Sequence, residues 1–243
     1  MGCRIRFLIL CGSPLVIFDM YYKYELHCHT GEVSSCADAP AEQTVKRYKE
    51  LGYSGIVITD HFSPLTFPAS KLFCPQRAAD YYLSGYRAAL GAAGDNFTVL
   101  LGMEIRFFAT PNDYLIYGMT EDFIKNSKNL LFSSLKKLHN MLDNKSMILI
   151  QAHPFRGYVR RANPEYLDGA EVFNGKSKND EENQNALQWA ESNGFKILTS
   201  GSDYHHLSNK INGGIETDEK IKTNQDLIRV LKSGNYNLIK GDI

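Results

Sequence analysis

The stretch YKYELHCH, residues 22–29, joins a run of strand-forming residues directly to a pair of histidines. Alternate side chains of an extended segment point to the same side, so His27 and His29 face one direction and Cys28 faces the other. Imidazole nitrogens are common ligands of Zn²⁺ and other divalent metals. The end of this strand is therefore a candidate metal site.

Four more blocks of histidine or carboxylate residues follow strand-forming runs in the same way. They are Thr59-Asp60-His61 after Gly55–Ile58, Gly102-Met103-Glu104 after Thr98–Leu101, Gln151-Ala152-His153 after Met147–Ile150, and Asp203-Tyr204-His205 after Lys196–Thr199. The carboxyl ends of parallel strands meet at one mouth of an α/β barrel. Imidazoles and carboxylates that converge there predict a centre with more than one metal ion.

The rest of the chain alternates predicted strands and helices, without a long linker or an internal repeat. The predicted helices cover residues 40–51, 78–93, 130–142, 180–193 and 224–234, and further strands cover residues 114–119, 169–173 and 236–240. This alternation of seven or eight strands with helices predicts a single-domain α/β fold, a TIM-like barrel over residues 21–243.

The composition is that of an ordinary globular domain. The 243 residues include 27 basic and 27 acidic side chains, and this balance argues against general nucleic-acid binding. The five cysteines contain no C-x-x-C pair, which argues against a disulfide framework and favours a reducing, cytoplasmic compartment. The sequence gives no reason to expect a membrane span or an obligate protein partner.

Residues 1–20 form an N-terminal extension with three interpretations. A mostly apolar run from Phe7 to Phe18 follows Arg4 and Arg6, and it is too short for a membrane span. The run is similar to a signal-peptide core, but charged or bulky residues occupy the place of a cleavage site. The alternatives are a packed extension of the domain, and a gene start assigned too early, with Met20 as the natural first residue.

The five blocks, in this order and relative spacing, resemble the PHP (polymerase and histidinol phosphatase) superfamily. The resemblance is carried by His27-x-His29, Thr59-Asp60-His61, Glu104, His153-Pro154 and Asp203-x-His205, which span most of the chain. It implies a distorted (β/α)7 barrel with two or three divalent metal ions at its mouth. Members of the superfamily mostly hydrolyse phosphoesters.

The resemblance also implies a ligand set. His27, His29, Glu104 and Asp203 would hold the first metal, His61 and His205 the second, and His153 with Glu104 would hold a third or complete the pair. Zn²⁺, Mn²⁺ and Fe suit such mixed nitrogen and oxygen ligands. Glu104 has two oxygens and is able to bridge two ions that lie ~3.5–4 Å apart.

The chain departs from the family pattern at two places. Many members have an Asp or His after the H-x-H pair, whereas this chain has residues 33–38, VSSCAD. Ser34 or Ser35 occupies the place, so a ligand is missing or replaced, and Cys36 or Asp38 could substitute only through a suitable loop geometry. Many members also have a histidine where this chain has Asp113, a candidate oxygen ligand. Two metal ions are therefore favoured over three.

Two arginines are candidates for substrate binding. Arg106 lies two residues after Glu104, and Arg156 lies three residues after His153. Arginine matches the geometry of phosphate with paired donors. Both residues are therefore expected to contact a phosphoryl group at the mouth of the barrel.

Two further residues adjoin predicted ligands. Asp60 precedes His61 and is a candidate for orienting a metal-binding histidine from behind. His206 follows His205 and is a candidate rim residue or a neighbour of a ligand.

Three functions are compatible with these features. The leading hypothesis is a histidinol-phosphatase-like phosphoesterase that uses a metal-activated hydroxide on a small phosphorylated metabolite. The second is amidohydrolase-type cleavage of a C–N bond or a lactone by the same chemistry. The third is a metal-binding interaction module without catalysis. The arginines favour the first, and the cost of burying so many polar groups argues against the third.

Overall fold

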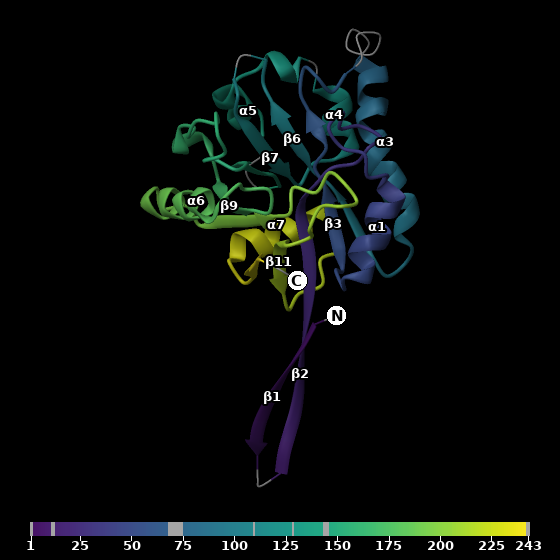
Figure 1. The fold of residues 1–243 in the computed structure, drawn as a ribbon, viewed down its shortest axis with the longest axis vertical. Coiled ribbons are helices and arrows are strands. Elements are labelled where there is room, and N and C mark those ends of the chain that lie inside the picture. The colour runs from purple at the N-terminus through teal and green to yellow at the C-terminus, as the bar shows by residue number, and fades with distance from the viewer. Residues whose placement is uncertain are drawn as a thin grey trace.

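The computed structural model describes residues 2–10, 13–67, 75–108, 110–127, 129–142 and 146–241. It shows a mixed α/β domain from which a two-stranded ribbon extends (Figure 1). The ribbon consists of β1 (Gly2–Leu10) and the outer part of β2 (Ser13–Cys28), which pair antiparallel. The predicted N-terminal extension corresponds to this ribbon.

The first sheet carries the strand that leads into the two histidines. Its order is β12 (Asn237–Lys240), β11 (Gly213–Thr217), β2, β3 (Gly55–Ile58) and β5 (Thr98–Leu101), with β1 paired to β2. β2, β3 and β5 run parallel, whereas β11 is antiparallel to β2 and to β12. The carboxyl ends of the parallel strands therefore point the same way, as the strand-end blocks predict.

The second sheet carries most of the other blocks. Its order is β10 (Ile197–Gly201), β9 (Gly169–Asn174), β8 (Ile148–Gln151), β7 (Asp113–Tyr117), β6 (Met103–Arg106) and β4 (His61–Phe62). β8, β9 and β10 run parallel, whereas β7 is antiparallel to β6 and to β8. The sequence analysis missed β4, β6 and β11. β4 has only two residues, and only Gly102 separates β6 from β5.

The two sheets adjoin each other on both sides of the domain. On one side the chain passes through Gly102 from β5 into β6. On the other side β10 lies against β2, where a Cβ on Gly201 would meet the Cβ of His27 at 2.3 Å, so only glycine fits. Among the described residues the ladders form two sheets. The single mixed α/β domain is confirmed, and the closed (β/α)7 TIM-like barrel stays a prediction.

Helices flank both sheets. They are α1 (Ala41–Glu50), α3 (Pro75–Ala93), α4 (Glu121–Asn126), α5 (Leu135–Met141), α6 (Asp180–Ser192) and α7 (Asn224–Ser233), with 3₁₀ turns η1 (Leu130–Phe132) and η2 (Pro164–Tyr166). α1 and α3 lie side by side near β3, and α6 lies beside β9 (Figure 1). Within the described part of the chain, none of the helices is both long and apolar enough to cross a bilayer.

The predicted single helix over residues 130–142 is wrong. η1 ends at Phe132, the backbone of the next residue, Ser133, is extended, and α5 begins only after Ser134. The side chain of Ser134 accepts a hydrogen bond from the backbone N of Lys137, which caps the new helix. The paired serines therefore divide a segment whose apolar periodicity alone resembled one helix.

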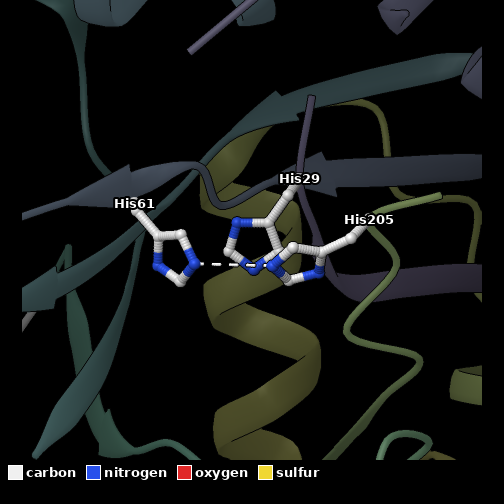
Figure 2. Close-up of side chains that lie close together, drawn as sticks. All are labelled: His29, His61 and His205. Carbon is white, nitrogen blue, oxygen red and sulfur yellow. Dashed lines mark hydrogen bonds between the residues drawn. The ribbon is translucent and has the colours of Figure 1, made fainter. Parts of the chain in front are cut away.

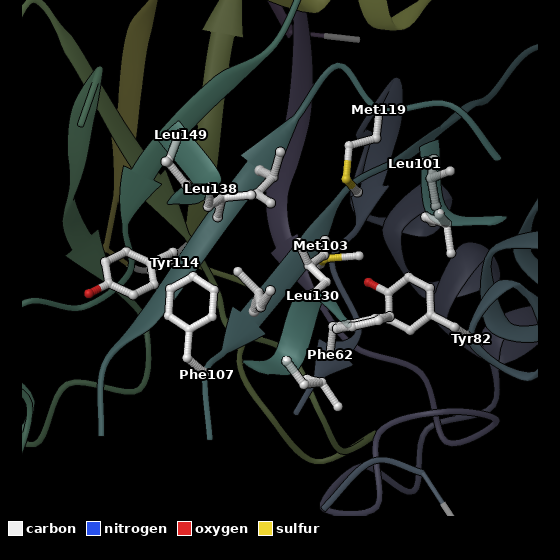
Figure 3. Packing of buried hydrophobic residues seen from close by; sticks show 14 of the residues in the cluster. Phe62, Tyr82, Leu101, Met103, Phe107, Tyr114, Met119, Leu130, Leu138 and Leu149 are labelled. Atoms are coloured by element: carbon white, nitrogen blue, oxygen red, sulfur yellow. The ribbon is translucent and has the colours of Figure 1, made fainter. Parts of the chain in front are cut away.

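The largest hydrophobic cluster forms the wall behind β6 (Figure 3). Met103 and Ile105 are fully buried in it, together with Tyr82 of α3 and Leu138 of α5. Full burial of such a side chain contributes about 1.5–3 kcal/mol. Because side chains alternate along a strand, Glu104 points to the opposite face of β6. The core thus fixes the strand that presents this carboxylate.

Candidate metal centre

The predicted ligand residues stand at or just beyond strand ends. His27 is next to last in β2, and Glu104 of β6 lies directly beside His61 of β4 in their parallel register. His153 and Asp203 follow β8 and β10, and both have a positive φ, 28° and 53°. Few non-glycine residues adopt such a backbone, and those that do cluster at functional sites.

The Glu104 carboxylate lies among four imidazoles. Its Oε1 is 2.9 Å from His153 Nε2 and 3.3 Å from His27 Nε2. Its Oε2 is 2.6 Å from His61 Nδ1 and 3.4 Å from His29 Nε2. Each oxygen therefore faces a different pair of imidazoles, which is the arrangement that the predicted bridging role requires.

Asp203 and His205 reach the same place from the segment after β10. Asp203 Oδ1 lies 3.3 Å from His29 Nε2 and 3.6 Å from His27 Nε2. His205 donates from Nδ1 to the backbone oxygen of Asp203 at 2.8 Å, and its Nε2 lies 3.4 Å from His61 Nε2. The structure thus brings all seven predicted ligand residues together.

Four overlapping groups of atoms lie close enough to share a metal ion. They are His29, His61 and His205 (Figure 2); His27, His29 and Glu104; His27, His153 and Asp203; and Glu104, Asp113 and His153. The His29 ring centroid is 4.2 Å from that of His61 and 4.0 Å from that of His205. Because the groups share members, they describe one candidate centre for several ions.

Four buried atoms of the predicted ligand residues lack a hydrogen-bond partner. One is His153 Nδ1, and the other three lie within 4 Å of another predicted ligand, in side chains that are at most 1% exposed: His27 Nε2, His29 Nε2 and Glu104 Oε2. A buried polar atom without a partner costs roughly 1–3 kcal/mol, so native proteins keep few of them. Divalent metal ions would satisfy the last three atoms. The residues present therefore fit such ions.

The charges of the centre shift its pKa values. Burial raises the pKa of Glu104, but the imidazoles, His61 first, outweigh burial and hold this pKa well below its usual value. Burial also raises the pKa of Asp203, but neighbouring cationic groups, His27 first and then Arg156, outweigh burial and hold this pKa well below its usual value. Burial lowers the pKa of His29 well below its usual value. Two ionised carboxylates and a neutral His29 are the forms that bind metal.

A buried carboxylate that the sequence analysis missed supports two of the histidines. Glu171 in β9 accepts a hydrogen bond from His27 Nδ1 at 2.8 Å and another from the backbone N of His153 at 2.9 Å. A carboxylate behind a metal-binding histidine fixes the ring and makes its other nitrogen a better ligand. The signal was present in the sequence, since Glu171 is the single charged residue in the run Gly169–Phe173.

Glu25 is a second buried carboxylate that the sequence analysis missed. Its Oε1 accepts hydrogen bonds from the backbone N of His27 and of Ser202, and its Oε2 accepts one from the Tyr48 hydroxyl. Glu25 therefore ties the end of β2 to the segment after β10. These two segments carry His27 and Asp203.

Asp60 lies behind His29. It accepts hydrogen bonds from Thr30 N, Thr30 Oγ1 and Ser34 Oγ, each at 2.7 Å. Because the Ser34 hydroxyl donates its one proton to Asp60, it must accept from His29 Nδ1, 3.2 Å away. This hydrogen bond leaves His29 Nε2 with a free lone pair, as a metal ligand needs. Gly85 of α3 leaves room for the Thr30 and Asp60 side chains, since a Cβ on Gly85 would lie 2.1 Å from Thr30 Oγ1.

A cleft of about 400 Å³ opens over the centre. Predicted ligands line it together with both candidate arginines and a lysine that the sequence analysis did not single out: His61, His153, His205, Asp113, Arg106, Arg156 and Lys176. The cleft therefore gives a substrate access to the candidate metal centre and surrounds it with basic side chains.

Arg106 and Asp113 face each other across β6 and β7. Arg106 donates from Nε and Nη2 to the two carboxylate oxygens of Asp113, at 2.7 and 2.5 Å. Asp113 Oδ2 also lies 3.8 Å from His153 Nε2. Both candidates are thus in the cleft, with Arg106 paired to the carboxylate that was expected to bind metal.

Arg156 enters the cleft next to Asp203. Its Nη2 donates to Asp203 Oδ2 and to Asn174 Oδ1, both at 2.5 Å, and the side chain is 26% exposed. The residue that was expected to contact substrate therefore also contacts a predicted ligand.

His206 and Cys36 lie at the rim of the cleft. His206 Nδ1 lies 2.9 Å from Asp38 Oδ1, and both side chains are exposed. Burial raises the pKa of Cys36, but the imidazoles of His205 and His61 outweigh burial and lower this pKa to about 6. His206 is thus at the rim, one of the two positions that its sequence neighbourhood allowed.

Three bacterial proteins of solved structure share this fold at low sequence identity. A two-domain protein from Bacteroides vulgatus that contains a predicted PHP-like metal-dependent phosphoesterase aligns with 15% identity and a TM-score of 0.65, over 90% of this chain and 64% of its own. PsfC from Pseudomonas syringae aligns with 15% identity and a TM-score of 0.62, over 86% of this chain and 88% of its own. An amidohydrolase from Chromobacterium violaceum, solved with sulfate and no metal, aligns with 13% identity and a TM-score of 0.52, over 89% of this chain and 97% of its own.

The chain spans just under two thirds of the length of the Bacteroides protein. A comparison with curated proteins found no match. A family model described as the PHP domain matches residues 25–229, a range that includes all five strand-end blocks. The chain therefore belongs to the PHP domain family.

Proposed function

We propose that this protein is a metal-dependent phosphoesterase that acts on a small phosphorylated substrate. The proposal is carried by the Glu104 carboxylate, whose two oxygens face two different pairs of imidazoles. When bound, two divalent ions would supply Lewis acidity and lower the pKa of a water molecule. The residues that would hold them are His27, His29, Glu104 and Asp203 for one ion, and His61 and His205 for the other, with His153 beside Glu104.

The basic side chains of the cleft support phosphate as the substrate group. A guanidinium has five N–H donors. Both hydrogen bonds that Arg156 makes to Asp203 and Asn174 use its Nη2, so other donors remain for a substrate oxygen. Lys176 lines the same cleft and adds a further positive charge. These groups would orient a phosphoryl group over the centre and balance its negative charge.

The size of the cleft supports a small substrate. Its volume of about 400 Å³ falls within the range of ~300–1,000 Å³ that is usual for small-molecule sites. A phosphorylated metabolite of the size of histidinol phosphate or of a nucleotide suits this volume. The proposal therefore covers both small phosphomonoesters and small phosphodiesters.

Cleavage of a C–N bond or a lactone is the second candidate function. One observation favours it: each candidate arginine is already paired with a carboxylate, Arg106 with Asp113 and Arg156 with Asp203. These pairs offset the positive charge that would attract a phosphate. A neutral substrate would then be admitted as readily as an anionic one.

The test is a substrate screen with metal-stripped protein that is reloaded with Mn²⁺ or Zn²⁺. Phosphomonoesters, phosphodiesters, amides and lactones are assayed side by side, and Glu104→Gln protein from the same purification controls for contaminating hydrolases. We expect metal-dependent turnover of a phosphoester that is absent from both the stripped and the variant protein. Turnover of amides or lactones alone would instead establish the second function. Bound metal without any turnover would indicate an interaction module.

A further inference from the structure

Two turns at the mouth of the cleft each follow a predicted metal ligand and each carry a large hydrophobic side chain. Leu65 comes shortly after His61, and Tyr158 comes shortly after His153. Leu65 is 81% exposed, Tyr158 is 64% exposed, and both line the cleft. Single exposed hydrophobic residues are common on protein surfaces, whereas a group of them in one cleft is typical of a ligand-binding groove.

The turn that carries Leu65 is fixed by two hydroxyl groups. Thr66 Oγ1 donates to the backbone oxygen of His61 at 2.8 Å and accepts from the backbone N of Ser63 at 3.2 Å. Ser63 Oγ in turn accepts from the backbone N of Leu65 at 3.3 Å. Ser63 and Thr66 are both buried, so the turn is anchored while the Leu65 side chain stays exposed to the cleft.

The turn that carries Tyr158 is fixed by its backbone. The backbone N of Val159 donates to the backbone oxygen of Arg156 at 2.8 Å, and Gly157 has a positive φ of 42° within this turn. Glycine adopts such a backbone without strain. Val159 is buried and anchors the far end of the turn. The turn therefore places Tyr158 close to Arg156, the arginine that contacts a predicted metal ligand.

The two turns emerge from strands on either side of the pair Arg106 and Asp113. That pair belongs to β6 and β7, which lie between β4 and β8 in the second sheet. β4 leads into the Leu65 turn and β8 into the Tyr158 turn. Because β4, β6 and β8 run the same way, both turns emerge at the same edge of the sheet. The cleft is thus flanked by a hydrophobic side chain from each side.

We propose that Leu65 and Tyr158 form a subsite for an apolar organic group of the substrate, so that the protein prefers phosphoesters with an apolar organic group over those of sugars and other polyols. This inference rests on the proposed function, because it requires the phosphoryl group to lie at the metal centre. Ligand clefts combine a few polar groups that fix orientation with hydrophobic and aromatic side chains that supply contact area. Arg156 would orient the phosphoryl group, and Leu65 and Tyr158 would contact the organic group. Removal of these apolar surfaces from water favours binding.

The test compares two phosphonates that differ only in an apolar ring, phenylpropylphosphonate and propylphosphonate. A phosphonate keeps the charge and shape of a phosphate monoester but is not hydrolysed, so its dissociation constant reports binding alone. Isothermal titration calorimetry measures both constants for metal-loaded wild type, Leu65→Ala and Tyr158→Ala. Leu90→Ala and Phe132→Ala are the matched controls, because these side chains are also exposed but lie outside the cleft.

We expect wild type to bind phenylpropylphosphonate at least about tenfold more tightly than propylphosphonate. Leu65→Ala and Tyr158→Ala should each lose roughly 3- to 10-fold of this preference and keep their affinity for propylphosphonate, because only the contact with the ring is removed. The controls should keep both affinities.

Equal affinity of wild type for the two phosphonates, or an unchanged preference in both cleft variants, would overturn the subsite. The substrate screen decides the proposed function separately. Phosphoester turnover without a preference for the ring-bearing phosphonate would therefore overturn the subsite alone. Wild type that binds neither phosphonate and turns over no phosphoester would overturn both.

Discussion

Replacing Glu104 with glutamine is expected to lower kcat on the best substrate by at least about 100-fold while the protein stays folded. Glutamine keeps the shape of the side chain, but its amide is uncharged and has one oxygen instead of two. Either the His27 and His153 pair or the His29 and His61 pair then loses its carboxylate partner. Replacing a residue that merely contacts a metal ligand typically lowers metal affinity or activity ~10–100-fold. Replacing a central ligand should therefore lower activity more.

The measurement combines kcat, metal content and the thermal unfolding curve of each purified protein. Glu219→Gln is the matched control, because Glu219 is a surface carboxylate that pairs with Arg229 and does not line the cleft. The control should keep wild-type activity and metal content. Near-wild-type turnover by Glu104→Gln would show that Glu104 does not bridge the two imidazole pairs.

Replacing Arg156 with alanine is expected to lower kcat/KM for a phosphoester by roughly 30- to 1000-fold. The estimate corresponds to ~2–4 kcal/mol for a charge-assisted contact that strengthens in the transition state. Metal content should stay unchanged, because Asp203 keeps its position through Asn174, whose Nδ2 lies 3.3 Å from Asp203 Oδ2. Lysine at this position should restore only part of the loss, because a point charge lacks the planar fork of guanidinium.

Arg160→Ala is the matched control for this prediction. Arg160 is an exposed arginine a few residues further along the same segment, and it does not line the cleft. Equal kcat/KM for wild type, Arg156→Ala and Arg156→Lys would remove Arg156 from substrate binding. Loss of metal from Arg156→Ala would assign the residue to holding Asp203 instead. Either result would weaken the preference for phosphoester over amide chemistry.

The sequence predicted which side chains the structure brings together, because the ends of neighbouring parallel strands lie at the same edge of the sheet. His27 and His29 alternate along one strand, so their common direction followed from the period of the strand alone. Glu104 was predicted as a carboxylate after a strand, and its placement among four imidazoles agrees with that expectation. The buried parallel strand β3 followed from its short β-branched run.

Contacts between residues far apart in the sequence could not be predicted from local sequence patterns. Glu171 supports His27 from 144 positions away in the chain, and no local pattern reports that contact. The pairing of Arg106 with Asp113 depends on the antiparallel register of β6 and β7, and β6 was missed because it follows β5 after one residue. The role of Ser34 depends on a loop whose path the sequence does not define.

Elemental analysis of metal-replete wild-type protein tests the central claim most directly. The protein is purified without chelator, dialysed against excess Zn²⁺ or Mn²⁺ and then against buffer, and its metal content is measured per chain. Four overlapping ligand groups, two of which contain Glu104, predict at least two equivalents of divalent transition metal. A content below one equivalent would contradict a metal centre of any kind, and a single equivalent would contradict Glu104 as a bridge between two ions.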